Sequence, residues 1–159
     1  MDPVAAASRV LIVAPDHELG AALAAVASQY ARAEACSSFR AARARLNATT
    51  YDLIATDLRL QEYNGLHLVY LSQRASTPPR AIVYDKYPDL GVAADVRRAG
   101  AFFEIARRLL VTLPSYLTGR LPHNDRRTPT TFDRRTSPRG GRRLWDHHVV
   151  NALATNAEW

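Results

Sequence analysis

The sequence YDLIATDLRLQEYNGLHL, residues 51–68, decides the fold class. Leu53, Ile54 and Ala55 are apolar, and the apolar run ends at the carboxylate of Asp57. A short continuous apolar run bounded by polar residues is typical of a strand that is buried on both faces of a parallel sheet. In an open α/β sheet the functional crevice lies beyond the carboxyl ends of the strands. We therefore predict that Asp57 is a reactive group or the remnant of one.

Further apolar runs alternate with helical patterns on both sides of this strand. They predict strands at 9–13, 33–36, 81–84 and 101–105, and helices at 18–32, 39–46, 65–74, 89–99 and from 107 onward. Such alternation is typical of βα repeats around a parallel sheet. Asp16 is placed to cap the first helix. Because proline kinks or breaks a helix interior, we expect the last helix either to be very short or to restart with Pro114 in its first turn.

Composition indicates a globular domain. The chain has 159 residues, of which 47% are hydrophobic, so wholesale disorder is excluded. Its apolar runs are far shorter than the roughly 20 residues of a membrane span. Residues 1–10 do not resemble a secretory signal, and we expect no membrane partner. The single cysteine, Cys36, rules out an intrachain disulfide and fits a reducing compartment, so we expect a cytoplasmic protein.

Composition changes after the predicted domain. Residues 119–159 hold 8 Arg against 4 acidic residues, whereas residues 1–118 hold 13 basic and 11 acidic residues. The sequence Asp-Arg-Arg-Thr occurs twice there, at 125–128 and 133–136. Because few apolar groups are present to offset the ordering entropy, we predict a flexible tail. The expected organisation is an N-terminal tail (1–8), a domain (9–118) and an Arg-rich tail (119–159) with a short terminal helix (146–157) that needs a surface to dock on.

The tail is a candidate for contacts with nucleic acid or with an acidic protein surface, because guanidinium groups neutralise phosphates and carboxylates. Since it has no folded reading head, a solubilising or partner-docking tail is favoured over a sequence-specific binder. The candidate residues are Arg126, Arg127, Arg134, Arg135, Arg142 and Arg143.

Between residue 9 and about residue 117 the chain resembles the receiver domain of bacterial response regulators. YDLIATDL and NGLHL resemble the phosphoacceptor strand and the glycine turn that follows it. RAIVYDKYPD (80–89) resembles the fourth strand, and RAGAFFEIARR (98–108) resembles the fifth. The resemblance implies a flavodoxin-like, doubly wound, five-stranded parallel sheet of order 2-1-3-4-5.

The resemblance also implies a phosphorelay chemistry, in which a phosphoryl group passes from a phosphohistidine to an aspartate. This transfer depends mostly on positioning and on neutralising the charge of the transferred oxygens. In the family a magnesium ion is held by an acidic pair after the first strand, by the acceptor aspartate and by a backbone carbonyl. The nominal acceptor here is Asp57, and Arg59 is the candidate for the carbonyl.

The magnesium ligands of the family are largely missing from this sequence. The acidic pair falls on Ala14 and Pro15, neither of which has a side-chain oxygen. Asp16 comes one position later and is better explained as the helix cap. Because magnesium requires oxygen ligands in near-octahedral geometry, we expect no cofactor, or only weak magnesium binding.

Other positions of the pattern have also changed. The hydroxyl after strand four becomes Asp85, the lysine after strand five becomes Arg107, and the aromatic switch position becomes Glu104. Asp57, Asp85 and Arg107 should converge at one end of the sheet, where a guanidinium between two carboxylates can form a charged cluster. Such a cluster can hold permanently the arrangement that phosphorylation normally induces.

Three functions remain open. The chain is a stand-alone phosphorelay receiver, a pseudo-receiver that binds proteins without phosphorylation, or a regulator that contacts nucleic acid through its tail. The first two imply a protein partner, namely a histidine kinase, a phosphotransfer protein or an output protein. That partner would contact the face formed by the fourth helix, the fifth strand and the fifth helix, and a homodimer is a further alternative. No hydrolase or dehydrogenase motif occurs, and we do not expect an enzyme.

Overall fold

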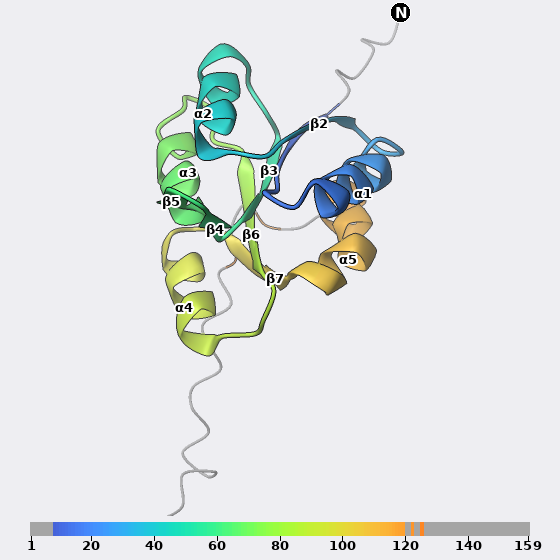
Figure 1. The fold of residues 1–159 in the computed structure, drawn as a ribbon. Coiled ribbons are helices and arrows are strands. Elements are labelled where there is room, and N and C mark those ends of the chain that lie inside the picture. The colour runs from blue at the N-terminus through green and yellow to red at the C-terminus, as the bar shows by residue number, and fades with distance from the viewer. Residues whose placement is uncertain (1–7, 120–121, 123–124, 126–159) are drawn as a thin grey trace, which may run out of the picture. The chain divides into compact units, whose positions relative to one another are not determined.

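The computed structural model describes residues 8–119, 122 and 125 (Figure 1). The predicted tails and the terminal helix at 146–157 lie outside the described residues, apart from Ser8, Gly119, Pro122 and Asp125. The tail arginines proposed for nucleic acid or partner contacts also lie outside them. The described elements are β1 (Arg9–Val13), α1 (His17–Ala27), β2 (Arg32–Cys36), α2 (Phe39–Ala48), β3 (Leu53–Asp57), β4 (Arg59–Leu60), β5 (Tyr63–Asn64), α3 (Gly65–Ser72), β6 (Arg80–Asp85), α4 (Leu90–Arg98), β7 (Phe102–Ile105) and α5 (Ala106–Thr118).

The main sheet has the predicted topology. Its strands are parallel and lie in the order β2-β1-β3-β6-β7. Because β4 and β5 form a separate antiparallel hairpin, β6 and β7 are the fourth and fifth strands of the sheet, and the predicted order 2-1-3-4-5 is confirmed. Helices α1 and α5 cover one face, and α2, α3 and α4 cover the other (Figure 1). The fold is therefore a doubly wound, flavodoxin-like α/β sheet.

The central strand β3 is buried on both faces, as its apolar run predicts. Leu53 and Ala55 pack in the cluster on the α1 and α5 side, whereas Ile54 packs in the cluster formed with α2 and α3. Burying a side chain of the size of Leu or Ile stabilises the fold by roughly 1.5–3 kcal/mol. The apolar run thus fixes β3 in the middle of the sheet, and Asp57 ends it at the sheet's carboxyl edge.

The first and last helices differ from the predicted ranges. Helix α1 ends at Ala27 instead of residue 32, because the backbone N–H of Arg32 binds the carbonyl of Ser8 and Arg32 starts the ladder with β1. Helix α5 runs unbroken to Thr118 with Pro114 inside it, so the expected break is wrong. Fully buried Leu109 and Leu113 anchor α5 to the core and offset the hydrogen bond that proline cannot make. None of the described helices has the length and apolar character needed to cross a membrane.

The β4–β5 hairpin was not predicted, because its strands have only two residues each. Gln61 at its tip adopts a left-handed backbone conformation with φ 45°. The ring of Tyr63 stacks on Phe39 of α2 at a centroid distance of 4.4 Å, and His67 of α3 meets both rings edge-on. This aromatic contact fixes the chain that follows Asp57 against α2.

Candidate functional site

The carboxyl ends of the strands form a cleft of about 760 Å³. It lies where β1, β3, β6 and β7 run into the loops and helices that follow them, as expected for an open α/β sheet. Six of the eight pocket residues predicted from the sequence line this one cleft together with Lys86, namely Pro15, Asp16, Asp57, Arg59, Asp85 and Arg107. Leu19, Tyr87, Pro88, Ala106 and Leu110 give it a largely apolar wall.

Asp57 lies half-buried at the end of β3. Its Oδ1 atom accepts a hydrogen bond of 2.8 Å from the backbone N–H of Arg59. Burial raises the pKa of Asp57 above its ordinary value; the hydrogen bond from Arg59 opposes this shift, and the negative charge of Asp85 adds to it. One oxygen of the nominal acceptor is therefore already bound within its own loop.

Asp85 is the most buried carboxylate of the cleft, with 4% of its surface exposed. Its Oδ1 accepts a hydrogen bond of 2.6 Å from the backbone N–H of Lys86. Its Oδ2 lies 3.4 Å from a guanidinium nitrogen of Arg59, whose side chain is 76% exposed. Arg59 therefore reaches from the rim of the cleft to the carboxylate that stands where the family has a hydroxyl. The sequence predicts a role only for the carbonyl of Arg59, and the contact of its side chain with Asp85 is seen only in the structure.

Arg107 meets Asp57 and Asp85 at the same end of the sheet, as predicted, but it does not form the predicted charged cluster with them. It lines the same cleft as Asp57 and Asp85, but it forms no ion pair with any carboxylate of the described residues. The reason is that α5 begins at Ala106, directly after β7, so that Arg107 lies in the exposed first turn of the helix. The guanidinium that pairs with Asp85 is therefore that of Arg59.

Tyr84 joins the strands that carry the site, and sequence reasoning missed it. Its side chain is fully buried, and its hydroxyl donates a hydrogen bond of 3.1 Å to the carbonyl of Val13. Because β3 lies between β6 and β1, this side chain crosses the central strand. Burial raises the pKa of Tyr84 far above its ordinary value, and the charge of Asp57 adds to the shift. The hydroxyl is therefore a fixed donor at all physiological pH values.

The donor atoms at the end of β1 do not fit a magnesium ion. Ala14 is buried in the core, with its Cβ 3.1 Å from the position that a Cβ on Gly20 of α1 would occupy. Asp16 caps α1, with Oδ1 accepting hydrogen bonds from the backbone N–H groups of Glu18 and Leu19. Within residues 8–119, 122 and 125 no three side chains of His, Cys, Asp or Glu are grouped to hold a metal ion. Asp57 and Asp85 remain in the cleft, and the Oδ1 atom of each already accepts a backbone hydrogen bond.

Glu104, at the switch position, is tied to α5. Its Oε2 accepts a hydrogen bond of 3.2 Å from the hydroxyl of Thr112, and its Oε1 lies 4.0 Å from Nε of Arg108. The neighbouring Phe103 packs in the cluster on the α4 side of the sheet. These contacts hold the end of β7 against α5.

Gly65 lets the chain after Asp57 fold back on the strand. A Cβ atom at this position would lie 2.1 Å from the carbonyl oxygen of Asp57, which no side chain tolerates. The backbone N–H of Gly65 also donates to the carbonyl of Leu58 at 2.8 Å. The glycine that the sequence singled out is therefore required by close backbone packing beside Asp57.

No protein-family model matches the chain, and no curated protein matches its sequence. Solved structures do match its fold. The response regulator DrrB of Thermotoga maritima, an OmpR/PhoB homologue, is 14% identical, with a TM-score of 0.62 over 70% of this chain and 52% of that one. This chain thus spans about half the length of that regulator.

Two further solved structures match the same part of the chain. The signal receiver domain of a putative LuxO repressor protein from Vibrio parahaemolyticus is 20% identical, with a TM-score of 0.62 over 70% of this chain and 90% of that one. A response regulator protein from Burkholderia pseudomallei is 16% identical, with a TM-score of 0.62 over 70% of this chain and 67% of that one. The latter structure contains a phosphorylated aspartic acid, a calcium ion and citrate.

Proposed function

We propose that this chain, which has the fold of a response regulator receiver domain, is a signalling module that acts through protein contacts without magnesium-dependent phosphorylation of Asp57. One observation carries the proposal: Arg59 pairs with Asp85 in the cleft that Asp57 also lines, while Ala14 and Pro15 stand where the resemblance places the acidic pair. In this proposal the chain is a pseudo-receiver, in which Arg59 pairs with Asp85 instead of with a phosphoryl group.

The charges of the cleft support this reading. Phosphoryl transfer to Asp57 requires that the charge on the transferred oxygens be neutralised. Asp85 instead presents a buried carboxylate, and its charge already raises the pKa of Asp57. The guanidinium of Arg59 already pairs with Asp85, and Arg107 is exposed on α5. A phosphoryl group on Asp57 would therefore face the buried carboxylate of Asp85, and the cations left to meet it would be Lys86 and Arg107 in the lining of the cleft.

The second candidate is a phosphorelay receiver that uses Asp57 as its acceptor. The observation in its favour is that Asp57 remains at the end of β3 and lines an open cleft. The two candidates are separated by incubating the protein with a small-molecule phosphodonor and magnesium and measuring the intact mass. We expect no phosphoryl adduct on the wild type at donor concentrations that fully modify a conventional receiver. An adduct on the wild type that is absent from Asp57→Asn would establish the phosphorelay receiver and overturn the proposal.

The partner surface in this proposal is the face formed by α4, β7 and α5. Leu90 of α4 and Val111 of α5 are 85% and 79% exposed, and Tyr87 precedes α4 with a largely exposed ring. Apolar groups exposed at this level stabilise a complex when a partner covers them. A hydrogen bond from Thr112 of α5 to Glu104 of β7 joins the helix to the strand in this face. The partner we propose is a histidine kinase, a phosphotransfer protein or an output protein, with a second copy of the chain as the alternative.

This face is tested by sedimentation velocity and by cross-linking in cell extract. Leu90→Ser together with Val111→Ser should abolish the cross-linked species that the wild type forms, because the apolar contact is lost. The matched control is Tyr70→Ser on α3, which removes an exposed apolar group from another part of the fold. An unchanged cross-linking pattern in the double variant would place the partner surface elsewhere.

A further inference from the structure

A second pocket lies at the end of the sheet opposite Asp57. Its volume is about 430 Å³, and it lies between the C-terminal parts of α2 and α3. Tyr51 and Pro79 line it just before β3 and β6 begin, whereas Asp57 and Asp85 end those strands. The volume falls within the range of roughly 300–1,000 Å³ found for small-molecule sites. This pocket is separate from the carboxylate cleft.

The charge of this pocket has one sign. Arg43 of α2 and Arg74, which follows α3, line it, and no Asp or Glu does. Neither guanidinium has an ion-pair partner among the described residues, so both are available to a ligand. A guanidinium presents a planar fork of donors that matches the oxygens of phosphate or carboxylate. The two arginines therefore favour an anionic group.

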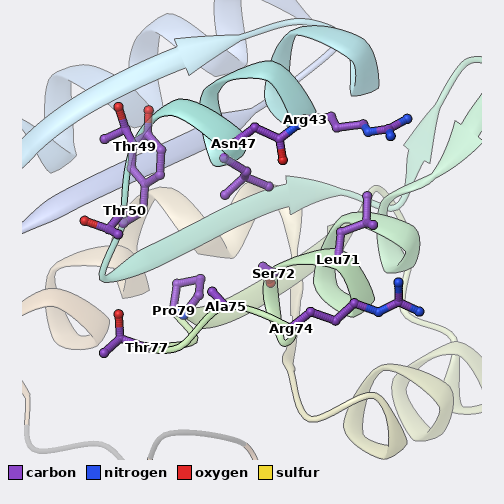
Figure 2. Close-up of a pocket in the computed structure, with 12 residues that line it drawn as sticks. Arg43, Asn47, Thr49, Thr50, Leu71, Ser72, Arg74, Ala75, Thr77 and Pro79 are labelled. Carbon is purple, nitrogen blue, oxygen red and sulfur yellow. The ribbon is translucent and has the colours of Figure 1, made fainter.

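Three hydroxyl groups of the pocket are available to a ligand, whereas the hydroxyl of Ser72 donates to the carbonyl of Val69. The hydroxyls of Thr49, Thr50 and Thr77 make no hydrogen bond to the described residues. The hydroxyl of Tyr51, by contrast, is used by Glu34 at 2.8 Å. Figure 2 shows the three threonines on one side of the pocket and the two arginines on the other, with both arginine side chains extending in the same direction. The pocket thus has a cationic side and a hydroxyl side.

The C-terminal ends of α2 and α3 affect whether this pocket can bind an anion. Helices α2 and α3 end at Ala48 and Ser72, so their carbonyl ends and partial negative charge face this end of the sheet. The helix ends therefore disfavour an anion in this pocket, and only the charges of Arg43 and Arg74 favour one. The threonine side suits an uncharged body that both donates and accepts hydrogen bonds, and Pro79, which lies on the same side of the pocket in Figure 2, offers an apolar contact there.

We propose that this pocket binds a small phosphate ester whose body carries hydroxyl groups, namely a sugar phosphate or a nucleotide. The phosphate lies at the arginine side, where Arg43 and Arg74 supply the positive charge, and the hydroxyl-bearing body extends toward Thr49, Thr50 and Thr77. This inference does not depend on the proposed function, because it concerns a different pocket and no residue of the carboxylate cleft.

The test is a titration of the full chain, followed by the backbone amide shifts of Thr49, Thr50 and Thr77 in NMR spectra. The probes are glucose 6-phosphate, adenosine monophosphate, inorganic phosphate and unphosphorylated glucose. We expect saturable shifts at these threonines with one of the two esters, weaker binding of inorganic phosphate and none of glucose. Which ester binds tighter distinguishes the sugar phosphate from the nucleotide.

The charge of the pocket is tested with a matched pair of double variants. Arg43→Gln with Arg74→Gln should weaken binding of the ester by about tenfold or more, because both charge-assisted contacts are lost. Arg32→Gln with Arg40→Gln removes the same net charge from exposed positions outside the pocket and should change affinity by less than about twofold. Equal losses in both double variants, or no shift at the threonines with any probe, would overturn the proposal. Equal affinity for inorganic phosphate and both esters would overturn the role of the threonine side.

Discussion

The hydroxyl of Tyr84 donates a hydrogen bond to the backbone carbonyl of Val13, 3.1 Å away, and so connects β6 to β1 across the central strand. Both residues belong to strands whose carboxyl ends border the cleft lined by Asp57 and Asp85. The bond is fully buried and joins positions 71 residues apart in the chain. It holds the ends of these strands together at the point where the family places its acidic pair.

Removing this hydroxyl should destabilise the fold. Tyr84→Phe keeps the ring and loses one buried hydrogen bond, so we expect a decrease of roughly 0.5–1.5 kcal/mol in the free energy of unfolding. Urea denaturation followed by circular dichroism measures the change. Tyr30→Phe is the control, because the ring of Tyr30 is about half exposed, and its effect should be close to zero. Equal stability of Tyr84→Phe and the wild type would mean that the bond contributes nothing.

The ion pair at Asp85 gives a second prediction. Arg59→Ala should lower the free energy of unfolding by roughly 0.2–1 kcal/mol, since the guanidinium of Arg59 is largely exposed and such pairs are weak. Arg107→Ala is the matched control and should have a smaller effect, because Arg107 has no ion pair with a described carboxylate. A double-mutant cycle with Asp85→Asn measures the coupling to each arginine. Stronger coupling of Asp85 to Arg107 than to Arg59 would restore the cluster predicted from the sequence.

The strand pattern could be predicted because it depends on local periodicity and burial. The apolar run before Asp57 has the length and polar boundaries of a buried parallel strand, and Asp16 has the side chain that a helix start requires. The sheet order then follows from the βα repeats and from the family resemblance. The strand pattern and the helix cap each depend on residues that are close together in the sequence, so they can be predicted without knowledge of tertiary contacts.

The details of the site could not be predicted, because they depend on contacts across the fold. The course of α5 through Pro114 follows from the burial of Leu109 and Leu113, which no local rule for proline includes. The choice between Arg59 and Arg107 as the partner of Asp85 depends on where α5 begins relative to β7. A chain rich in arginine offers several cations near each carboxylate, and only the backbone path selects one.

Gly65 gives a third prediction, since its missing side chain is required by the backbone of Asp57. Gly65→Ala would place a Cβ atom 2.1 Å from the carbonyl oxygen of Asp57, so the chain beside the cleft must shift. We expect a loss of roughly 1–3 kcal/mol in the free energy of unfolding, the usual cost of forcing extra volume into a packed site. Gly91→Ala is the control, because Gly91 is exposed in α4 and a Cβ there would meet only the side chain of Asp89 at 3.2 Å. If Gly65→Ala and Gly91→Ala both lower the free energy of unfolding only slightly, the loop after β3 can shift to accommodate the added Cβ atom at little cost.

The last prediction concerns the dependence of stability on pH. Burial raises the pKa of Asp57 above its ordinary value of 3.8, so the folded protein favours the protonated carboxyl group. A group whose pKa is raised on folding contributes stability that is fully present below its unfolded pKa and is lost as the pH rises through its folded pKa. At about pH 7 the ionised carboxylate therefore costs stability, and Asp57→Asn should unfold at a temperature a few degrees higher than the wild type does.

The difference should shrink as the pH falls toward about 4, because the wild-type carboxyl group becomes neutral like the amide. Asn also keeps an oxygen that accepts the hydrogen bond from the backbone of Arg59, so the change removes the charge and little else. Glu62→Gln, at an exposed position of the β4–β5 hairpin, is the control for removing one negative charge from a basic protein. Thermal unfolding of the three proteins across this pH range measures the effect. A gap between Asp57→Asn and the wild type that stays constant with pH would show that burial of the Asp57 charge is not its cause.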